Sequence, residues 1–157
     1  MDINELLQRY EQGERDFSRI NLPGVNLPDV DLSGVNLEGA NLSEANLCQA
    51  NLSGANLSKA NLRKANLCQV NLSEANLSEA NLAEANLIEA NLSNANLEQA
   101  NLTETNLGFA VLVKANLSMA NLCNAFLVAA NLTDANLQFA VTHGAIMPDN
   151  IPASTRT

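Results

Sequence analysis

The sequence is poor in the residues that build aromatic cores and nucleic-acid-binding faces. Trp is absent and aromatic residues make up only 3% of the chain, so any core must be aliphatic. Lys and Arg together number 8 against 17 Asp and Glu, and the formal net charge is −9. A nucleic-acid partner requires Lys and Arg clustered on one face, so we expect no direct binding of nucleic acid.

Signals for export and membrane insertion are also missing. No N-terminal stretch joins a basic region to an apolar run, which argues against a signal peptide or a transmembrane span. The three cysteines, Cys48, Cys68 and Cys123, are an odd number without the spacing of a disulfide framework. This pattern favours reduced thiols, and we expect a cytoplasmic protein that makes no membrane contact.

What the sequence has in abundance is a period of five residues. Every position ending in 2 or 7 from Leu22 to Leu137 is Leu, the residue before it is usually Asn, and the one before that is usually Ala. An α-helix would turn about 500° in five residues and scatter these leucines around its axis. A continuous strand fails as well, because an odd period moves successive leucines to opposite faces.

The five-residue unit instead predicts a short strand followed by a corner. Ala, Asn and Leu alternate inward, outward and inward, and the two variable residues that follow suffice for a turn. Corners that always bend in one direction close a coil, and stacked coils pair as parallel strands about 4.8 Å apart. The pattern therefore predicts an all-β solenoid.

The repeat resembles the pentapeptide repeat family, whose signature is A-[N/D]-L-x-x, as in the residues ANLSE at 75–79. The resemblance covers residues 15–144 and implies a right-handed quadrilateral parallel β-helix with four units per coil. On that fold these 130 residues form about 6.5 coils of 20 residues, a rod roughly 30 Å long. Periodicity alone leaves the number of sides open, since a 15-residue coil also pairs Lys59 with Glu44 and Glu74. The uninterrupted repeats and the ending GAIMPD resemble cyanobacterial members.

The two ends depart from the repeat. Residues 1–14 are expected to form a capping helix, because Ile3, Leu6, Leu7 and Tyr10 share one helical face and Asp2 with Glu5 resembles a capping box. Residues 15–144 form the β-helix, and residues 145–157 are expected to be a C-terminal cap and flexible tail. The helix should cover the open end of the first coil, because an uncapped solenoid exposes its core and edge strands.

Residues with catalytic or metal-binding chemistry do not converge. His143 is the only His and lies where the repeat ends, and no three or four ligands have metal spacing. Cys48 and Cys68 are neighbours on one wall of a 20-residue coil, and no further metal ligand joins them. We expect two outward thiols in a reducing cell, with a disulfide between them as the alternative. We therefore expect no enzyme activity, no cofactor and no metal.

One coil carries a ring of carboxylates, the acidic girdle: Glu74, Glu79, Glu84 and Glu89. Carboxylates on different outer walls diverge and cannot form an acid/base pair, so the girdle is either a solvated face or a contact for a basic partner. The resemblance implies an alternative function here, since some family members bind DNA gyrase by imitating duplex DNA. Residues 15–144 carry one net negative charge per about 5 Å of rod, whereas duplex DNA carries one per about 1.7 Å.

Outward positions become apolar in the C-terminal half. On four-sided coils six of them fall on two adjoining walls, and we name this group the apolar patch: Ile88, Phe109, Val111, Val113, Phe126 and Val128. Met119 and Phe139 lie 20 residues apart on another wall. A contiguous exposed apolar cluster marks an interaction site, so we expect self-association or docking of a protein partner. The alternative is that the cluster turns inward beneath the C-terminal tail.

Overall fold

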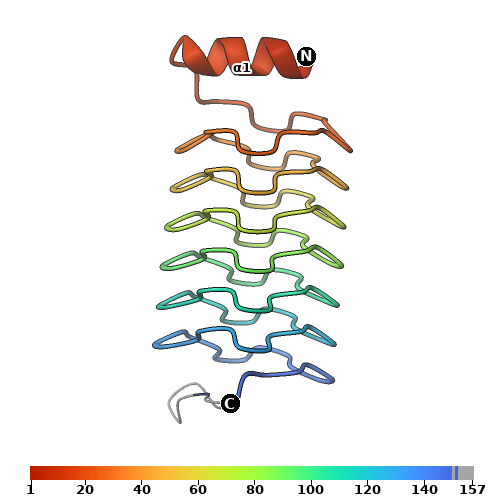
Figure 1. Ribbon diagram of the computed structural model, residues 1–157, viewed down its shortest axis with the longest axis vertical. Coiled ribbons are helices and arrows are strands. Elements are labelled where there is room, and N and C mark those ends of the chain that lie inside the picture. The colour runs from red at the N-terminus through yellow and green to blue at the C-terminus, as the bar shows by residue number, and fades with distance from the viewer. Residues whose placement is uncertain (150, 152–157) are drawn as a thin grey trace.

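The computed structural model describes residues 1–149 and residue 151, and shows one helix at the end of a stack of coils (Figure 1). Helix α1 comprises Ile3–Glu11. No extended strand is assigned within the described residues; parallel pairing is made by single bridge residues that recur around each coil. The part of the predicted C-terminal tail at residues 150 and 152–157 lies outside the described residues.

Each coil contains 20 residues and has four sides. The bridges join residues 20 apart, from Asp16↔Asn36 to Phe126↔Ile146, and successive bridges along the chain are five residues apart. This register excludes the 15-residue coil that periodicity had left open. The pairing also continues beyond residue 144, because Ile146 N–H donates to the Ala125 carbonyl over 2.9 Å. Backbone hydrogen bonds to both neighbouring coils make the stack continuous.

The core contains the Leu and Ala columns, as the repeat predicts. Leu87 and Ala90 are fully buried, and the same holds for their counterparts in the central coils. Thr105 is the one buried polar residue among those described, and it takes the place of an Ala. Its hydroxyl donates to the Leu82 carbonyl over 2.9 Å, which satisfies the group without opening the wall.

The corners hold a backbone strain that sequence periodicity does not reveal. At nearly all corners the N–H three residues after the central Leu donates to its carbonyl, as Ala100 does to Leu97 over 3.0 Å. The second turn residue lies in the left-handed region, with φ of 58° at Gln99. Non-glycine residues occupy this conformation at a cost of about 1–2 kcal/mol each. The close stacking of neighbouring coils maintains it.

Replacing Gln99 with Gly is therefore expected to stabilise the rod. Glycine adopts the left-handed conformation without the steric cost that Gln pays. Its greater conformational entropy in the unfolded chain offsets part of this stabilisation, so the free energy of unfolding should rise by up to about 1 kcal/mol. Gln99→Val should lower it by a similar amount, because a β-branched residue tolerates positive φ poorly. Chemical denaturation of the two variants beside the parent protein measures both, and equal stabilities would contradict the strain.

Outward Asn side chains form ladders along the rod. Asn66 Nδ2 donates to Asn46 Oδ1 over 3.0 Å, while Asn66 Oδ1 accepts the Cys68 N–H over 3.4 Å. Asn66 thus links two coils and also holds its own corner, and most other Asn side chains of the central coils do the same. Asp16 and Asp31 begin two of the ladders, and their pKa values are lowered mainly because the backbone N–H groups of the serines two residues later donate to them.

Helix α1 closes the N-terminal end of the core, as its sequence predicts. Leu6 is buried, and Ile3, Leu7 and Tyr10 pack against the same cluster. Asp2 is the N-cap and accepts the Glu5 N–H over 2.9 Å. The Tyr10 hydroxyl donates to the Ser33 carbonyl over 2.7 Å, which ties the helix to the first coil.

Candidate functional site

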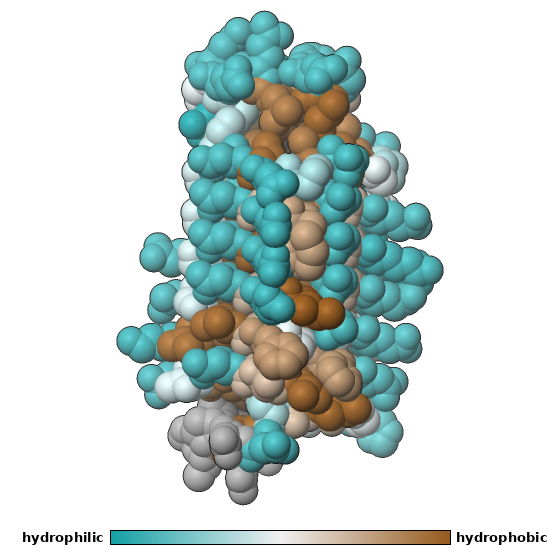
Figure 2. Space-filling view, in the orientation of Figure 1, coloured by the Kyte–Doolittle hydropathy of each residue, from teal (hydrophilic) through white to brown (hydrophobic). Residues whose placement is uncertain are grey.

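The apolar patch lies near the C-terminal end of the rod. Figure 2 shows hydrophobic side chains gathered at this end and also next to helix α1 at the other end, while most of the surface between them is polar. Phe109 is 63% exposed, Phe126 is 41% exposed, and Val128 and Val111 are also exposed. Ile88 and Val113 are half-buried. The exposed members are therefore available to a partner and do not turn inward.

The centre of the patch forms around Phe126, which occupies a position where the repeat normally has Asn. Its ring lies over Gly108: a Cβ added at Gly108 would be 3.9 Å from the ring carbon Cδ1 and 3.3 Å from Asn106 Oδ1. Gly108 is consequently buried although it is a corner residue. Phe109 and Val128 share this corner in adjacent coils, since the Phe109 N–H donates to the Val128 carbonyl over 2.9 Å.

The structure adds Ile146 to this surface, which sequence reasoning missed. Ile146 is 52% exposed and pairs with Phe126 in the last bridge of the stack. The Leu column ends before this point, so the repeat pattern hid the additional coil segment. The available signal was the triplet Ala145, Ile146 and Met147, which keeps the unit's inward, outward and inward alternation with Met in place of Leu.

The six predicted patch residues do not all share one side of the coil. Phe126 lies on a side, Val128 and Phe109 lie at the corner that follows it, and Val111 belongs to the next side, five residues from Asn106 in the same coil. Val113 lies at the corner beyond. The patch thus curves around one corner, and its densest part comprises four residues: Phe109, Phe126, Val128 and Ile146.

A second exposed apolar pair lies on the opposite corner. Met119 and Phe139 are 53% and 74% exposed. Met119 follows Phe109 by ten residues and Phe139 follows Ala129 by ten, which is half of a 20-residue coil, so the pair lies on the corner opposite to Phe109. Phe109 and Phe139 are both second turn residues, with φ of 58° and 60°. This pair is separate from the patch and provides matched positions for control substitutions.

The acidic girdle is partly neutralised by cations of the preceding coil. Lys59 Nζ lies 3.9 Å from Glu79 Oε1, and Lys64 Nζ lies 3.6 Å from Glu84 Oε2, with Arg63 also paired to Glu84. Glu89 accepts a hydrogen bond from Gln69 over 2.8 Å. These contacts are solvent-exposed, so each stabilises the fold by less than about 1 kcal/mol. Their main effect is to weaken the girdle as a binding surface for a basic partner.

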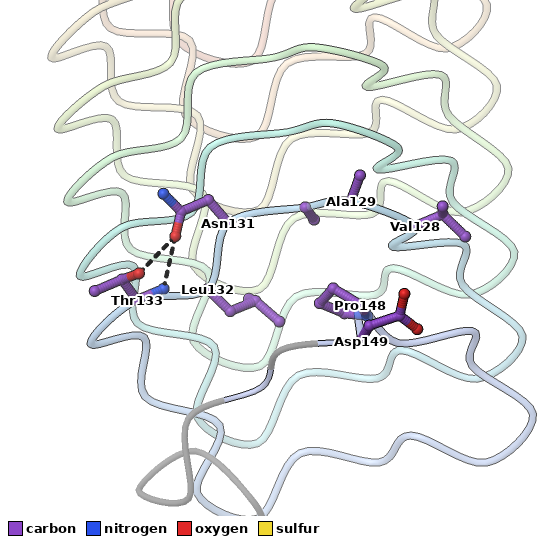
Figure 3. A pocket seen from close by; sticks show the side chains of 8 residues that line it. Val128, Ala129, Asn131, Leu132, Thr133, Pro148 and Asp149 are labelled. Atoms are coloured by element: carbon purple, nitrogen blue, oxygen red, sulfur yellow. Dashed lines mark hydrogen bonds between the residues drawn. The ribbon is translucent and has the colours of Figure 1, made fainter.

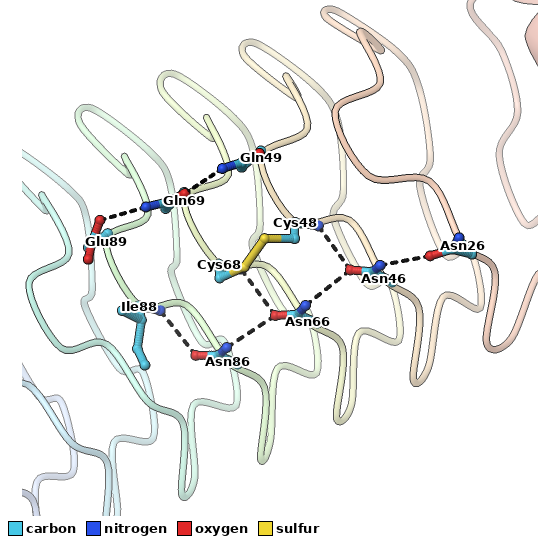
Figure 4. The surroundings of a disulfide bond; sticks show 10 residues. All are labelled: Asn26, Asn46, Cys48, Gln49, Asn66, Cys68, Gln69, Asn86, Ile88 and Glu89. Carbon is cyan, nitrogen blue, oxygen red and sulfur yellow. Dashed lines mark hydrogen bonds between the residues drawn. A yellow bond between two sulfur atoms is a disulfide. The ribbon is translucent and has the colours of Figure 1, made fainter.

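The expectation of two free thiols at Cys48 and Cys68 is wrong, because the structure joins them in a disulfide (Figure 4). The two residues occupy the same corner position in consecutive coils, which places their Cα atoms 4.7 Å apart. That separation is within the range of disulfides. In the same column Ile88 follows in the next coil, so the disulfide and the patch share one corner of the rod. Cys123 is free.

Replacing Cys48 and Cys68 with Ser is expected to destabilise the protein without changing its fold. The disulfide closes a loop with a sequence separation of 20 residues, and loop-closure entropy in the unfolded chain predicts a loss of about 3 kcal/mol. Denaturant unfolding of the double variant measures this, with Cys123→Ser as the control that should change stability little. Equal stability of the double variant and the parent under oxidising conditions would contradict a stabilising role of this disulfide.

An open pocket borders the patch at the last coil (Figure 3). Val128, Leu132 and Pro148 contribute apolar atoms, while Thr133 and Asp149 contribute polar ones. Among the described residues of its lining, Asp149 is the only carboxylate, and His143 is exposed on another corner. Among the residues that the structure describes, no three His, Cys, Asp or Glu lie close enough to hold a metal ion. In the same described range, no helix is long and apolar enough to cross a membrane.

Comparisons with known proteins agree with this architecture. The family model "Pentapeptide repeats" matches in overlapping segments that together span residues 16–147. No curated protein sequence matches. A pentapeptide repeat protein from Nostoc PCC 7120, alr5209, is 42% identical with a TM-score of 0.60, covering 63% of this chain and 79% of that one. Rfr23 from the cyanobacterium Cyanothece 51142 is 33% identical with a TM-score of 0.50, covering 93% of this chain and 99% of that one. Neither printed name describes an enzymatic activity.

Proposed function

Because this chain belongs to the pentapeptide repeat family and has its right-handed quadrilateral β-helix, we propose that it is a non-catalytic interaction protein. The rod presents the apolar patch, including Ile146, to another protein. The observation that carries this proposal is the cluster of exposed Phe109, Phe126 and Val128 on a largely polar surface. Contiguous exposed apolar surface is unfavourable in water and is typical of protein contacts.

The construction of the rod favours binding by a preformed surface. Every coil is bonded to its neighbours, and Phe126 is held between the Asn106 and Ile146 bridges. A partner therefore does not have to order the backbone of this surface, which lowers the entropic cost of association. Burial of the large aromatic side chains supplies the binding free energy, as is usual at the centre of an interface.

The test is capture of partners from a lysate of the source organism at low and high salt. The parent protein is compared with a Phe109→Ser, Phe126→Asn variant and with a Met119→Ser, Phe139→Ser control, after circular dichroism shows that all three are folded. We expect a partner that the parent and the control retain at high salt and that the patch variant loses. Retention by the patch variant, with release by salt, would place binding on the acidic walls instead.

Binding of DNA gyrase by charge mimicry is the second candidate. It is favoured by residues 65–104, which contain six Glu and neither Lys nor Arg. It is weakened by the pairing of Glu79 and Glu84 with cations and by the low charge density of the rod. Addition of the protein to a gyrase supercoiling reaction distinguishes charge mimicry from docking through the apolar patch. Salt-sensitive inhibition of supercoiling would support mimicry, and no inhibition at any protein concentration would exclude it.

A further inference from the structure

We propose that the apolar patch binds a second copy of this chain, with the two rods antiparallel and overlapping only at their C-terminal coils. This inference rests on the proposed function, because it names the partner of the same site. The contact is isologous, so the side that carries Phe126 and Ile146 meets the same side of the other copy. The corner residues Phe109 and Val128 extend the contact on one edge.

Charge distribution identifies the second copy as an acceptable partner. Residues 105–149 contain one Lys and two Asp, a net charge of −1. Residues 65–104 contain six Glu and neither Lys nor Arg, although Glu79 and Glu84 pair with cations of the preceding coil. The patch is therefore the part of this acidic protein on which two copies can approach with little repulsion. Like charges brought together across an interface are costly, and they select against arrangements that juxtapose them.

The same distribution selects the antiparallel arrangement. With a twofold axis at the level of Phe126, that residue meets its own counterpart, and the coil of Phe109 meets the coil of Ile146. The coil that contains Glu84 and Glu89 then extends past the end of the other rod. In a parallel arrangement with the same sides in contact, the acidic coils of the two copies would face each other along their length.

The size of the patch determines how strong the association of the two copies is expected to be. Its exposed residues occupy three consecutive coil levels, marked by Asn106, Phe126 and Ile146 in one bridge column, a height of about 10 Å at the usual strand spacing. A side of five residues is at most about 17 Å long, so a contact of this height covers less area than a standard interface of about 800 Å² per partner. We therefore expect a dimer that forms at micromolar concentration rather than an obligate one, and one that high salt does not dissociate.

The first test is sedimentation equilibrium over a concentration series at low and high salt. The parent protein, with a monomer mass of 16.7 kDa, should approach twice that mass at both salt concentrations. The Phe109→Ser, Phe126→Asn variant should remain monomeric throughout. The Met119→Ser, Phe139→Ser control should dimerise like the parent, because it removes equally exposed apolar residues from the opposite corner.

The second test examines the arrangement by cross-linking. In a background with Cys48, Cys68 and Cys123 replaced by Ser, Val128→Cys places a thiol beside the twofold axis. A mild chemical oxidant, which takes two electrons from the two thiols as they release two protons, should join two copies through a disulfide. Phe139→Cys in the same background should give no such product, and both proteins are first checked by circular dichroism.

The outcomes separate this inference from the proposed function. A parent protein that is monomeric at every concentration, but whose patch variant still loses a lysate partner, overturns the dimer and leaves the proposed function in place. If the Met119→Ser, Phe139→Ser variant is monomeric while the Phe109→Ser, Phe126→Asn variant still dimerises, the dimer inferred here is overturned. A monomeric parent whose patch variant also keeps its lysate partner overturns both. Dimerisation of the parent with efficient cross-linking at Val128→Cys supports the antiparallel contact.

Discussion

Deletion of residues 1–13 is expected to turn the protein into an aggregating species that loses its cooperative thermal transition. The deletion removes helix α1 and with it Leu6, which is 1% exposed and belongs to the same core cluster as Phe17. The first coil would then present its apolar interior and an unpaired edge to water, and both promote association between chains. Thermal unfolding recorded with light scattering measures both effects.

A point variant distinguishes loss of the cap from loss of chain length. Leu6→Asp keeps all residues but places an unpaired carboxylate in the core, so it should lower the melting temperature and increase scattering in the same direction. Glu11→Gln, on the exposed side of the helix, should leave both unchanged. A truncated protein that melts like the parent and stays soluble would show that the core needs no cover at this end.

Replacement of Leu87 by Ala is expected to cost about 2–5 kcal/mol of stability. Leu87 is fully buried in a central coil, and its neighbours belong to a wall that cannot collapse around a cavity because it is bonded above and below. Denaturant unfolding gives the free energy, and hydrogen exchange shows whether protection falls in adjacent coils as well. Glu74→Ala on the outer surface should change stability by no more than about 0.5 kcal/mol, and an equal effect of the two substitutions would contradict the core assignment.

The regular part of this fold follows from the sequence because one physical constraint recurs at every unit. Leu at a period of five excludes both a helix and a flat strand, and Ala beside it leaves room only for a narrow core. The number of sides required more than the period, since Lys59 could face Glu79 on one coil size or Glu44 on another. The bridge register between residues 20 apart resolves this.

The features that the sequence did not reveal depend on contacts between coils. The Cys48–Cys68 disulfide requires the stacking distance of corner residues, whereas the prediction of free thiols relied on an expected reducing environment. Ile146 was missed because its coil segment pairs through the backbone after the Leu column has ended. The left-handed conformation of corner residues such as Gln99 was also hidden, because glycine occurs at only some corners.

The residues of the candidate site could be predicted from the sequence more fully than their packing. The apolar substitutions at Phe109 and Phe126 break the repeat and can be found by comparing units. On four-sided coils the sequence also places them on two adjoining walls, apart from Phe139. The position of Phe126 over Gly108 and the exposure of Ile146 beside it require the structure. The sequence therefore identifies which residues are unusual, and the fold decides which of them act together.

The most direct test of the patch as the contact surface is side-chain oxidation footprinting of the protein alone and in its complex. The complex can be the dimer or an assembly with a captured partner. Phe109 and Phe126 are expected to become protected in the complex while Met119 and Phe139 oxidise at unchanged rates. Protection of Met119 and Phe139 with continued oxidation of Phe109 and Phe126 would contradict this expectation and place the contact on the opposite corner of the rod.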